Sequence, residues 1–307
     1  MDKSTTFADM ITELSILLPA YNNVCFDMVQ TLHRQASSIE GLDFEILVAD
    51  DGSTDMKALE ANRRINQLEH CKLMECNVNR GRARIRNFLA EMAQYGWLLF
   101  LDSDVGIREG FIQSYVEVDA KASVYCGGIT IQQNATQWAD NLRYRYKEAF
   151  LKKNTTKIAN QAPYKSFRSA NFMARQSVMS AHKFNTNITT YGYEDVLLGK
   201  DLQQDDIPAL HIDNPVMIDH FEDNASFLKK TAVSCQTLYM FRNDLKGYSS
   251  LLHLVKILHE MHVTPLVAWL FRRNQERIER RLSGRKPSVK LFQLFRIGCL
   301  AMQFEMK

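Results

Sequence analysis

The 307-residue sequence has few of the residues that mark unusual structural classes. It contains only 13 Gly and 6 Pro, and its apolar content of 46% is that of an ordinary folded protein, which excludes collagen-like, low-complexity and wholly disordered chains. Its six Cys are scattered without CxxC spacing, which excludes a disulfide framework and a zinc-ligand pattern. We therefore expect reduced, mostly buried thiols.

Long apolar runs and a secretory leader are also missing. The longest apolar stretch near the C-terminus, Val263 to Phe271, is far shorter than the ~20 residues of a membrane-spanning helix. The segment Met1 to Phe7 has no basic start leading into an apolar run and no small-residue cleavage site. The sequence therefore predicts a cytoplasmic protein without a membrane span.

Positive charge is concentrated at one end of the chain. The net charge is +3, but the residues from Pro265 onward hold ten Lys or Arg against three Asp or Glu, so the first 264 residues carry −4. Because the larger part is acidic and the Arg-rich segment lacks a recognition motif, we expect no nucleic-acid partner.

Short apolar segments alternate with segments of helical period in the first hundred residues. The expected strands are 14–18, 44–49, 72–74 and 97–101, and helix-face spacing appears in 25–36, 59–68 and 85–92. Strand and helix in alternation predict an α/β fold with a mostly parallel sheet flanked by helices. Ligands of such sheets bind at the carboxyl ends of the strands.

The rest of the chain gives a less regular pattern. From Ala225 onward it is helical, with breaks at Gly247, Pro265 and the turn 284–287. A mobile loop is expected at 154–167, which is polar and lacks periodicity. The other expected elements are strands at 124–130, 170–174 and 207–218, a helix at 137–152 and a helix that opens near Glu194.

Carboxylates follow two of the expected strands. Asp50 and Asp51 end the second strand, and a plain structural interpretation is a turn in which Ser53 or Asp55 caps the next helix. After the fourth strand, Asp102, Ser103 and Asp104 place two carboxylates at i, i+2. Such a pair suits Mg²⁺ or Mn²⁺ beside a nucleotide diphosphate, although it is also a common exit from a strand.

Taken together, these segments resemble family 2 glycosyltransferases of the GT-A fold. The motifs that carry the resemblance are Pro19-Ala20-Tyr21-Asn22, Asp50-Asp51-Gly52-Ser53, Asn79-Arg80-Gly81 with Arg86-Asn87, Asp102-Ser103-Asp104, and Tyr191-Gly192-Tyr193-Glu194-Asp195. The last is similar to an acceptor-site motif of galactosyltransferase-like enzymes. The resemblance implies a catalytic domain over 1–230, with a nucleotide-sugar half at about 12–130 and an acceptor half at about 131–230, followed by a helical, basic region at 231–307.

The resemblance implies a UDP-sugar donor and a divalent cation, Mn or Mg. Pro19, Ala20 and Tyr21 would line the base pocket, and either Asp50 or Asp51 would accept a hydrogen bond from the base. Arg86, rather than Arg82 or Arg84, would lie near the diphosphate, and Ser103 and Asp102 near the ribose or the metal. The metal ligands would be Asp104, Asp102 and His220, with His211 a weaker alternative to His220.

On the acceptor side, the resemblance implies a single protein base and inversion at the sugar. Asp195 is the candidate base, because a carboxylate can take the proton of the attacking hydroxyl. Glu194 would bind acceptor hydroxyls, and it is the alternative base. The family pattern usually has Trp where this chain has Tyr191 or Tyr193, so the platform for the acceptor ring is left open.

Two interpretations remain for the basic C-terminal region. Either it packs on the catalytic domain with a solvated basic face, or it lies on an anionic membrane where a lipid-linked glycan acceptor resides, at the inner face of a bacterial cell membrane. The leading function is a glycosyltransferase of polysaccharide or glycan assembly. The competing classes are a sugar nucleotidyltransferase, whose Gly-rich phosphate loop is missing here, and a non-catalytic membrane-surface adaptor.

Overall fold

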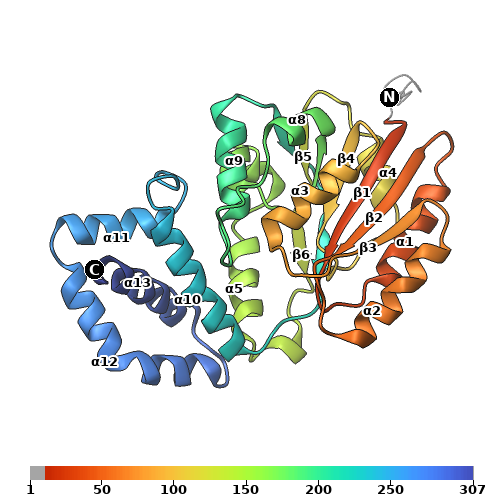
Figure 1. The fold of residues 1–307 in the computed structure, drawn as a ribbon. Helices are drawn as coiled ribbons and strands as arrows, with labels where there is room; N and C mark the ends of the chain where they lie inside the picture. The colour runs from red at the N-terminus through yellow and green to blue at the C-terminus, as the bar shows by residue number, and fades with distance from the viewer. Residues whose placement is uncertain (1–10, 307) are drawn as a thin grey trace. The chain divides into compact units, whose positions relative to one another are not determined.

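The computed structural model describes residues 11–306, which divide into two compact units (Figure 1). The first unit holds the chain up to Thr130, Thr156–Thr186 and Leu198–Asp219; the second holds Ile131–Thr155, Asn187–Leu197 and the chain from His220 onward. The segment Met1 to Phe7, on which the prediction about a secretory leader rests, lies outside the described residues. The domain boundary at residue 230 stays a prediction; in the structure the two units interleave along the chain.

A seven-stranded sheet with the order β3-β2-β1-β4-β7-β5-β8 forms the centre of the first unit. β1 runs parallel to β2 and β4, and β2 runs parallel to β3, while β7 is antiparallel to both β4 and β5. The expected mostly parallel sheet is therefore confirmed. The strands of this sheet are β1 (Glu13–Ala20), β2 (Asp43–Asp50), β3 (Cys71–Glu75), β4 (Trp97–Leu101), β5 (Val124–Cys126), β7 (Asn171–Arg175) and β8 (Ala209–His211).

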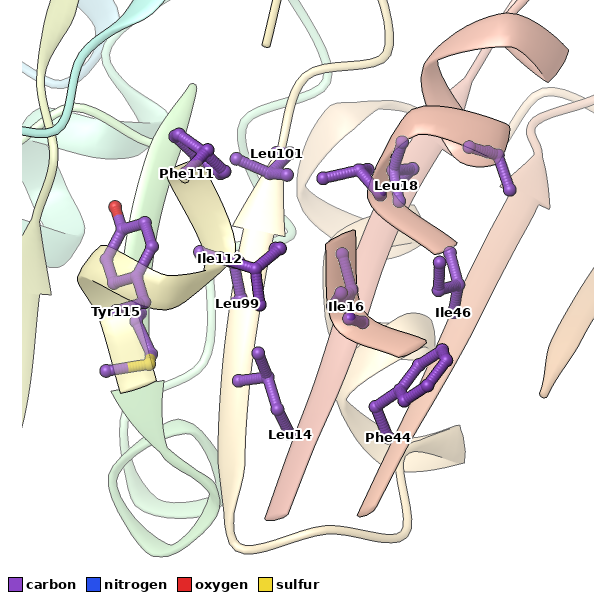
Figure 2. Close-up of a cluster of buried hydrophobic side chains, with 14 of the residues drawn as sticks. Leu14, Ile16, Leu18, Phe44, Ile46, Leu99, Leu101, Phe111, Ile112 and Tyr115 are labelled. Carbon is purple, nitrogen blue, oxygen red and sulfur yellow. The ribbon is translucent and has the colours of Figure 1, made fainter. Parts of the chain in front are cut away.

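The sheet is covered by helices on both faces because its central strands are apolar on both sides. Along β1, Leu14, Ile16 and Leu18 point to one face and pack with the helices α1 (Phe26–Ser37) and α4 (Phe111–Val116) (Figure 2). Leu17 points to the other face and packs with α3 (Arg82–Met92), α8 (Gln176–Ala181) and the later part of α9 (Glu194–Gln204). The first unit is thus a three-layer α/β/α arrangement.

The helices follow the expected pattern in the first hundred residues. The helices that precede residue 205 are α1 (Phe26–Ser37), α2 (Met56–Arg63), α3 (Arg82–Met92), α4 (Phe111–Val116), α5 (Leu142–Leu151), α6 (Thr156–Ala159), α7 (Pro163–Ser166), α8 (Gln176–Ala181) and α9 (Glu194–Gln204). Two 3₁₀ helices, η2 (Arg64–Gln67) and η3 (Thr136–Trp138), lie between them. The alternation of strand and helix from β1 to β4 is confirmed. α4 and α8 are short and had no periodic signal.

Three of the later expectations need correction. The strand expected at 124–130 divides into β5 and β6 (Ile129–Ile131), because Gly128 takes a positive φ of 77° between them. The strand expected at 207–218 divides into β8 and β9 (Val216–Ile218), interrupted by Pro215, which cannot donate to a ladder. The loop expected at 154–167 contains α6 and α7, and Asn160 fixes it through paired hydrogen bonds to the backbone of His211.

The second unit is built around the C-terminal helices, α10 (Asn224–Met240), α11 (Ser250–Glu260), α12 (Thr264–Ser283) and α13 (Val289–Glu305), which confirm the helical pattern from Ala225. α13 packs against the other three. It approaches α12 closely at Gly298, where an added Cβ would lie 2.3 Å from the Phe271 ring. In the described part of the chain no single helix is long and apolar enough to cross a membrane, although α11 and α12, bent by 115° at their junction, pass that test as a pair.

Candidate active site

The strand order reverses beside β1. The chain runs from β1 through β2 to β3 at one edge, and α3 then returns it to β4 on the other side of β1. Ala20 pairs with Asp50, and Leu17 pairs with Phe100, so the carboxyl ends of β1, β2 and β4 come together. Such a reversal is where open α/β sheets bind ligands, which makes this edge the candidate active site.

Two asparagines after β1 tie these strand ends to one another. Asn22, in a left-handed conformation, donates from its backbone N–H to the hydroxyl oxygen of Ser53, and its side-chain oxygen accepts hydrogen bonds from the amides of Thr54 and Asp55. Asn23 donates from its side-chain amide to the carbonyl oxygen of Ser103 at 2.7 Å. Sequence reasoning gave neither asparagine a role. The available signal was Asn directly after a strand, a position where Asn tolerates φ > 0, as Asn22 does.

Asp50 closes the turn that follows β2. It is 2% exposed, and its two carboxylate oxygens accept hydrogen bonds from the amide and the hydroxyl of Ser53, at 2.8 and 2.5 Å. Asp55 caps α2 by accepting from the amides of Lys57 and Ala58, which resolves the choice between Ser53 and Asp55. The interpretation of this segment as a turn that caps the next helix is therefore confirmed.

Asp51 fastens the loop before α3 to the end of β2. Its buried carboxylate accepts hydrogen bonds from the amides of Arg80 and Gly81 at 2.7 and 2.9 Å. Burial raises the pKa of Asp51, and these two hydrogen bonds oppose that shift. Gly52 makes the approach possible, since a Cβ there would lie 2.6 Å from the backbone of Val78 and Asn79. Which of the two aspartates contacts a base stays a prediction.

Arg86 is the cationic centre of this edge. It is 2% exposed, and its guanidinium forms an ion pair with Asp102 at 2.5 Å. Arg82 lies 3.8 Å from the other oxygen of Asp102. Arg86 and Arg82 together offset the negative charge of Asp102. The buried Nε atom of Arg86 has no hydrogen-bond acceptor among the described residues.

Asp104 is exposed at the end of the turn that begins with Asp102 and Ser103. Within residues 11–306, no group of three His, Cys, Asp or Glu side chains is arranged to hold a metal ion. Mg²⁺ and Mn²⁺ bound with a nucleotide take one or two protein carboxylates and complete their shell with phosphate and water oxygens. The donor set of Asp104 and the partly exposed Asp102 fits that requirement.

Where the base pocket is predicted, Ala20 is buried, Pro19 is partly buried and Tyr21 is 48% exposed. Asn87, the neighbour of Arg86 in α3, is occupied by paired hydrogen bonds with the backbone of Phe184. Among the residues named at these strand ends, Tyr21 is thus the exposed aromatic residue. Aromatic faces of this kind are suited to stacking on a nucleobase.

The predicted acceptor residues belong to the second unit. Glu194 and Asp195 begin α9, where the helix dipole favours negative charge. Glu194 is buried and Asp195 is partly exposed. Tyr193 packs into the apolar cluster of the second unit, where burial raises its pKa, whereas Tyr191 is 37% exposed. Tyr191 is therefore the tyrosine of this motif whose ring is accessible.

The two candidate histidines differ clearly. His211 ends β8, and its Nε2 lies 3.0 Å from the carbonyl oxygen of Pro163, so the ring serves the packing of the α6–α7 segment. Burial lowers the pKa of His211. His220 is exposed and begins the C-terminal part of the second unit. Its role as a metal ligand stays a prediction.

The family of the chain follows from a comparison of its sequence with protein-family models. The model described as "Glycosyl transferase family 2" matches residues 15–181, which is more than half of the chain. The chain belongs to glycosyl transferase family 2. The matched residues include the ends of β1, β2 and β4 that form the candidate site. This membership confirms the predicted family and favours it over the sugar nucleotidyltransferase alternative.

Curated relatives of this family 2 chain match only parts of it. An uncharacterized glycosyltransferase of Haemophilus influenzae is 34% identical over 94 residues, which is 30% of this chain and 36% of that protein. A teichoic acid poly(glycerol phosphate) polymerase of Staphylococcus epidermidis is 23% identical over 190 residues, which is 59% of this chain and 25% of that protein. The matched stretches thus span about a quarter to a third of the relatives' own lengths.

Solved structures match the family 2 chain over nearly its whole length. A mannosyltransferase from Pyrobaculum calidifontis, solved with GDP-Man and Mn²⁺, has a TM-score of 0.58 at 13% identity and covers 96% of this chain and 88% of its own. Residues 1–349 of S. aureus TarS have a TM-score of 0.54 at 15% identity, with coverage of 95% and 90%. This likeness shows the fold, which is the expected GT-A type.

Proposed function

We propose that this family 2 glycosyltransferase moves a sugar from a UDP-sugar to an acceptor hydroxyl with inversion and requires a divalent cation. The observation that carries the proposal is the cluster of Arg86, Asp102 and Asp104 at the reversal of the strand order. A buried cation beside carboxylates can receive a diphosphate and a metal together. Two solved relatives in fold support a nucleotide-sugar donor: TarS 1–349 was solved with UDP-GlcNAc, and the mannosyltransferase with GDP-Man and Mn²⁺.

On the donor side, Tyr21 would stack on the base and Arg86 would lie beside the diphosphate. The Nε atom of Arg86 that has no acceptor among the described residues gives this group a hydrogen bond to offer. Asp102 holds the guanidinium in place, because it accepts from Arg86 and lies near Arg82.

Asp104, with Asp102, would hold the cation, and His220 would complete its protein ligands. A bound Mn²⁺ or Mg²⁺ would offset the charge that grows on the departing nucleotide, so that no general acid is needed. For the chain itself, this leaves one proton to move. It is the proton of the acceptor hydroxyl.

Asp195 would take that proton as the hydroxyl attacks the sugar from the face opposite the diphosphate. One in-line displacement of this kind inverts the configuration. Asp195 is preferred to Glu194 because it is the more exposed of the two carboxylates in the first turn of α9. Glu194 would then position acceptor hydroxyls near Tyr191.

The test is to incubate the full chain and Mn²⁺ with a panel of UDP- and GDP-sugars, measuring nucleotide release, with thermal shift as the binding readout. A ligand at a hundred times its Kd stabilises a protein by about 2.7 kcal/mol, which makes binding detectable without turnover. We expect one UDP-sugar to bind and to release UDP. Binding of no nucleotide sugar would refute the proposal and favour a non-catalytic role. The acceptor that we propose is a glycan or a lipid-linked glycan of polysaccharide assembly.

A further inference from the structure

Helix α12 has a second face that the core does not use. Its buried residues, Thr264, Ala268, Phe271 and Leu282, fall on one side of the helix at 3.6 residues per turn. On the opposite side the same spacing places an apolar half followed by a basic half. The residues of this outward face are Leu266, Trp269 and Leu270, and then Arg273, Arg277 and Arg280.

Helix α11 and the turn after it also carry exposed apolar side chains. Leu254, Ile257 and Met261 lie at i, i+3 and i+7 and are exposed, with Met261 at 64%. α11 and α12 meet at 115° and both pack on α13 (Figure 1). We use the term "α11–α12 corner" for these three residues together with the six of the outward face of α12.

The apolar residues of the corner are too exposed to be part of the core. Leu266 and Trp269 are each 56% exposed, and contiguous exposed apolar residues with a polar border mark interaction surfaces. The basic half shows what kind of surface fits. Among the described residues, Arg273, Arg277 and Arg280 form no ion pair, and with one exposed carboxylate nearby, Glu276, this part of the helix keeps a net positive charge.

We propose that the α11–α12 corner binds an anionic lipid bilayer. Trp269 and the neighbouring aliphatic side chains would enter the boundary between headgroups and acyl chains, and the three arginines would lie on the lipid phosphates. A second copy of this chain is a poorer occupant, because a symmetric interface would bring the same arginine-bearing face of each copy together. The inference goes beyond the proposed function and does not depend on catalytic turnover.

The first experiment is co-sedimentation of the full chain with phosphatidylcholine vesicles that contain or lack phosphatidylglycerol. Each arginine near an anionic surface contributes roughly a five-fold factor to partitioning. The variant Arg273→Gln/Arg277→Gln/Arg280→Gln should therefore lose on the order of 100-fold in binding to the anionic vesicles. The matched control, Lys72→Gln/Lys157→Gln/Lys229→Gln, removes three exposed lysines that lie outside α11 and α12 and should bind nearly as the parent does.

Added salt should weaken the binding of the parent chain, because exposed charges are screened. Equal binding to neutral and anionic vesicles, or an equal loss in both triple variants, would overturn the proposal. A third outcome would also overturn it: the chain does not sediment with vesicles, and light scattering shows a dimer that Leu266→Ser dissociates. The α11–α12 corner would then be an interface between two copies of the chain. Circular dichroism of each variant checks that the helices remain folded.

The second experiment places Trp269 in the bilayer. Lipids brominated in their acyl chains quench only tryptophans that enter the apolar boundary. We expect anionic vesicles of this kind to quench the parent fluorescence, and we expect Trp269→Phe, which keeps an apolar ring, to bind but to lose the quenching. Quenching that persists in Trp269→Phe would assign the signal to Trp97 or Trp138 and contradict the proposed orientation.

Discussion

Removing either partner of the Arg86–Asp102 ion pair should have unequal consequences for stability. Arg86 is 2% exposed, so the substitution Asp102→Ala leaves a guanidinium buried without its carboxylate. Removal of one partner of a buried ion pair typically lowers the free energy of unfolding by about 3 to 5 kcal/mol. We expect a loss of that size from Asp102→Ala.

The reverse substitution, Arg86→Met, should cost less. It keeps much of the apolar stem of the side chain, and the remaining carboxylate of Asp102 is 20% exposed and lies 3.8 Å from Arg82. Water and Arg82 can therefore replace part of the lost interaction. A loss of about 1.5 to 3 kcal/mol is expected, which corresponds to one hydrogen bond to a charged group.

The assay is urea unfolding followed by the fluorescence of Trp97. Trp97 is 7% exposed at the start of β4, the strand that ends before Asp102, so it reports on the first unit. A background of Trp138→Phe/Trp269→Phe leaves it as the only tryptophan. Arg86→Met that destabilises as strongly as Asp102→Ala would refute the reasoning. So would losses that add within about 0.5 kcal/mol in the double variant, because coupled residues should not be additive.

Three further predictions concern the same edge and the acceptor motif. Gly52→Ala should lower the free energy of unfolding by roughly 2 to 4 kcal/mol, because it combines a positive φ with a Cβ 2.6 Å from the backbone of Val78 and Asn79. The control in urea unfolding is Gly41→Ala, which has a φ of 76° in open space and therefore measures the φ contribution alone. Burial raises the pKa of Asp51, so this carboxyl binds a proton more readily in the folded protein than in the unfolded chain. Its contribution to stability is therefore present below the ordinary pKa of 3.8 and is lost as the pH rises through the raised pKa. Urea midpoints measured across this pH range should fall in the parent and not in Asp51→Asn. Asp195→Asn should keep donor affinity and lower kcat by about 10² to 10⁴; a larger fall for Glu194→Gln would exchange the two roles.

Most of the fold was predictable because its early strands are apolar and its helices periodic. Both signals are local, and they set β1 to β4 and the helices between them. The antiparallel direction of β7 was not predictable, since the Asn171–Arg175 segment gains its partners, β4 and β5, only in the folded sheet. Pro215 is a signal for a strand break, but the residues around it alternate as in a strand, and we therefore expected one continuous strand.

The candidate site shows a similar division. Asp102 and Asp104 were recognisable from their place after an apolar strand, because the carboxyl ends of parallel strands meet. The ion pair between Asp102 and Arg86 was not, since the family resemblance singled out Arg86 only as a neighbour of the diphosphate, and its burial and its contact with Asp102 arise in the folded structure. The links made by Asn22 and Asn23 depend on loops 30 to 80 residues away, which no local pattern describes.

The central claim is that the edge formed by β1, β2 and β4 binds a nucleotide through a divalent cation. Calorimetric titration of UDP into the full chain, with Mn²⁺ and with excess chelator, tests it most directly when Asp104→Asn is titrated in parallel. We expect binding with Mn²⁺, and an affinity at least tenfold weaker both in chelator and in Asp104→Asn, with the fold unchanged by circular dichroism. Equal UDP affinity under all of these conditions would contradict the account.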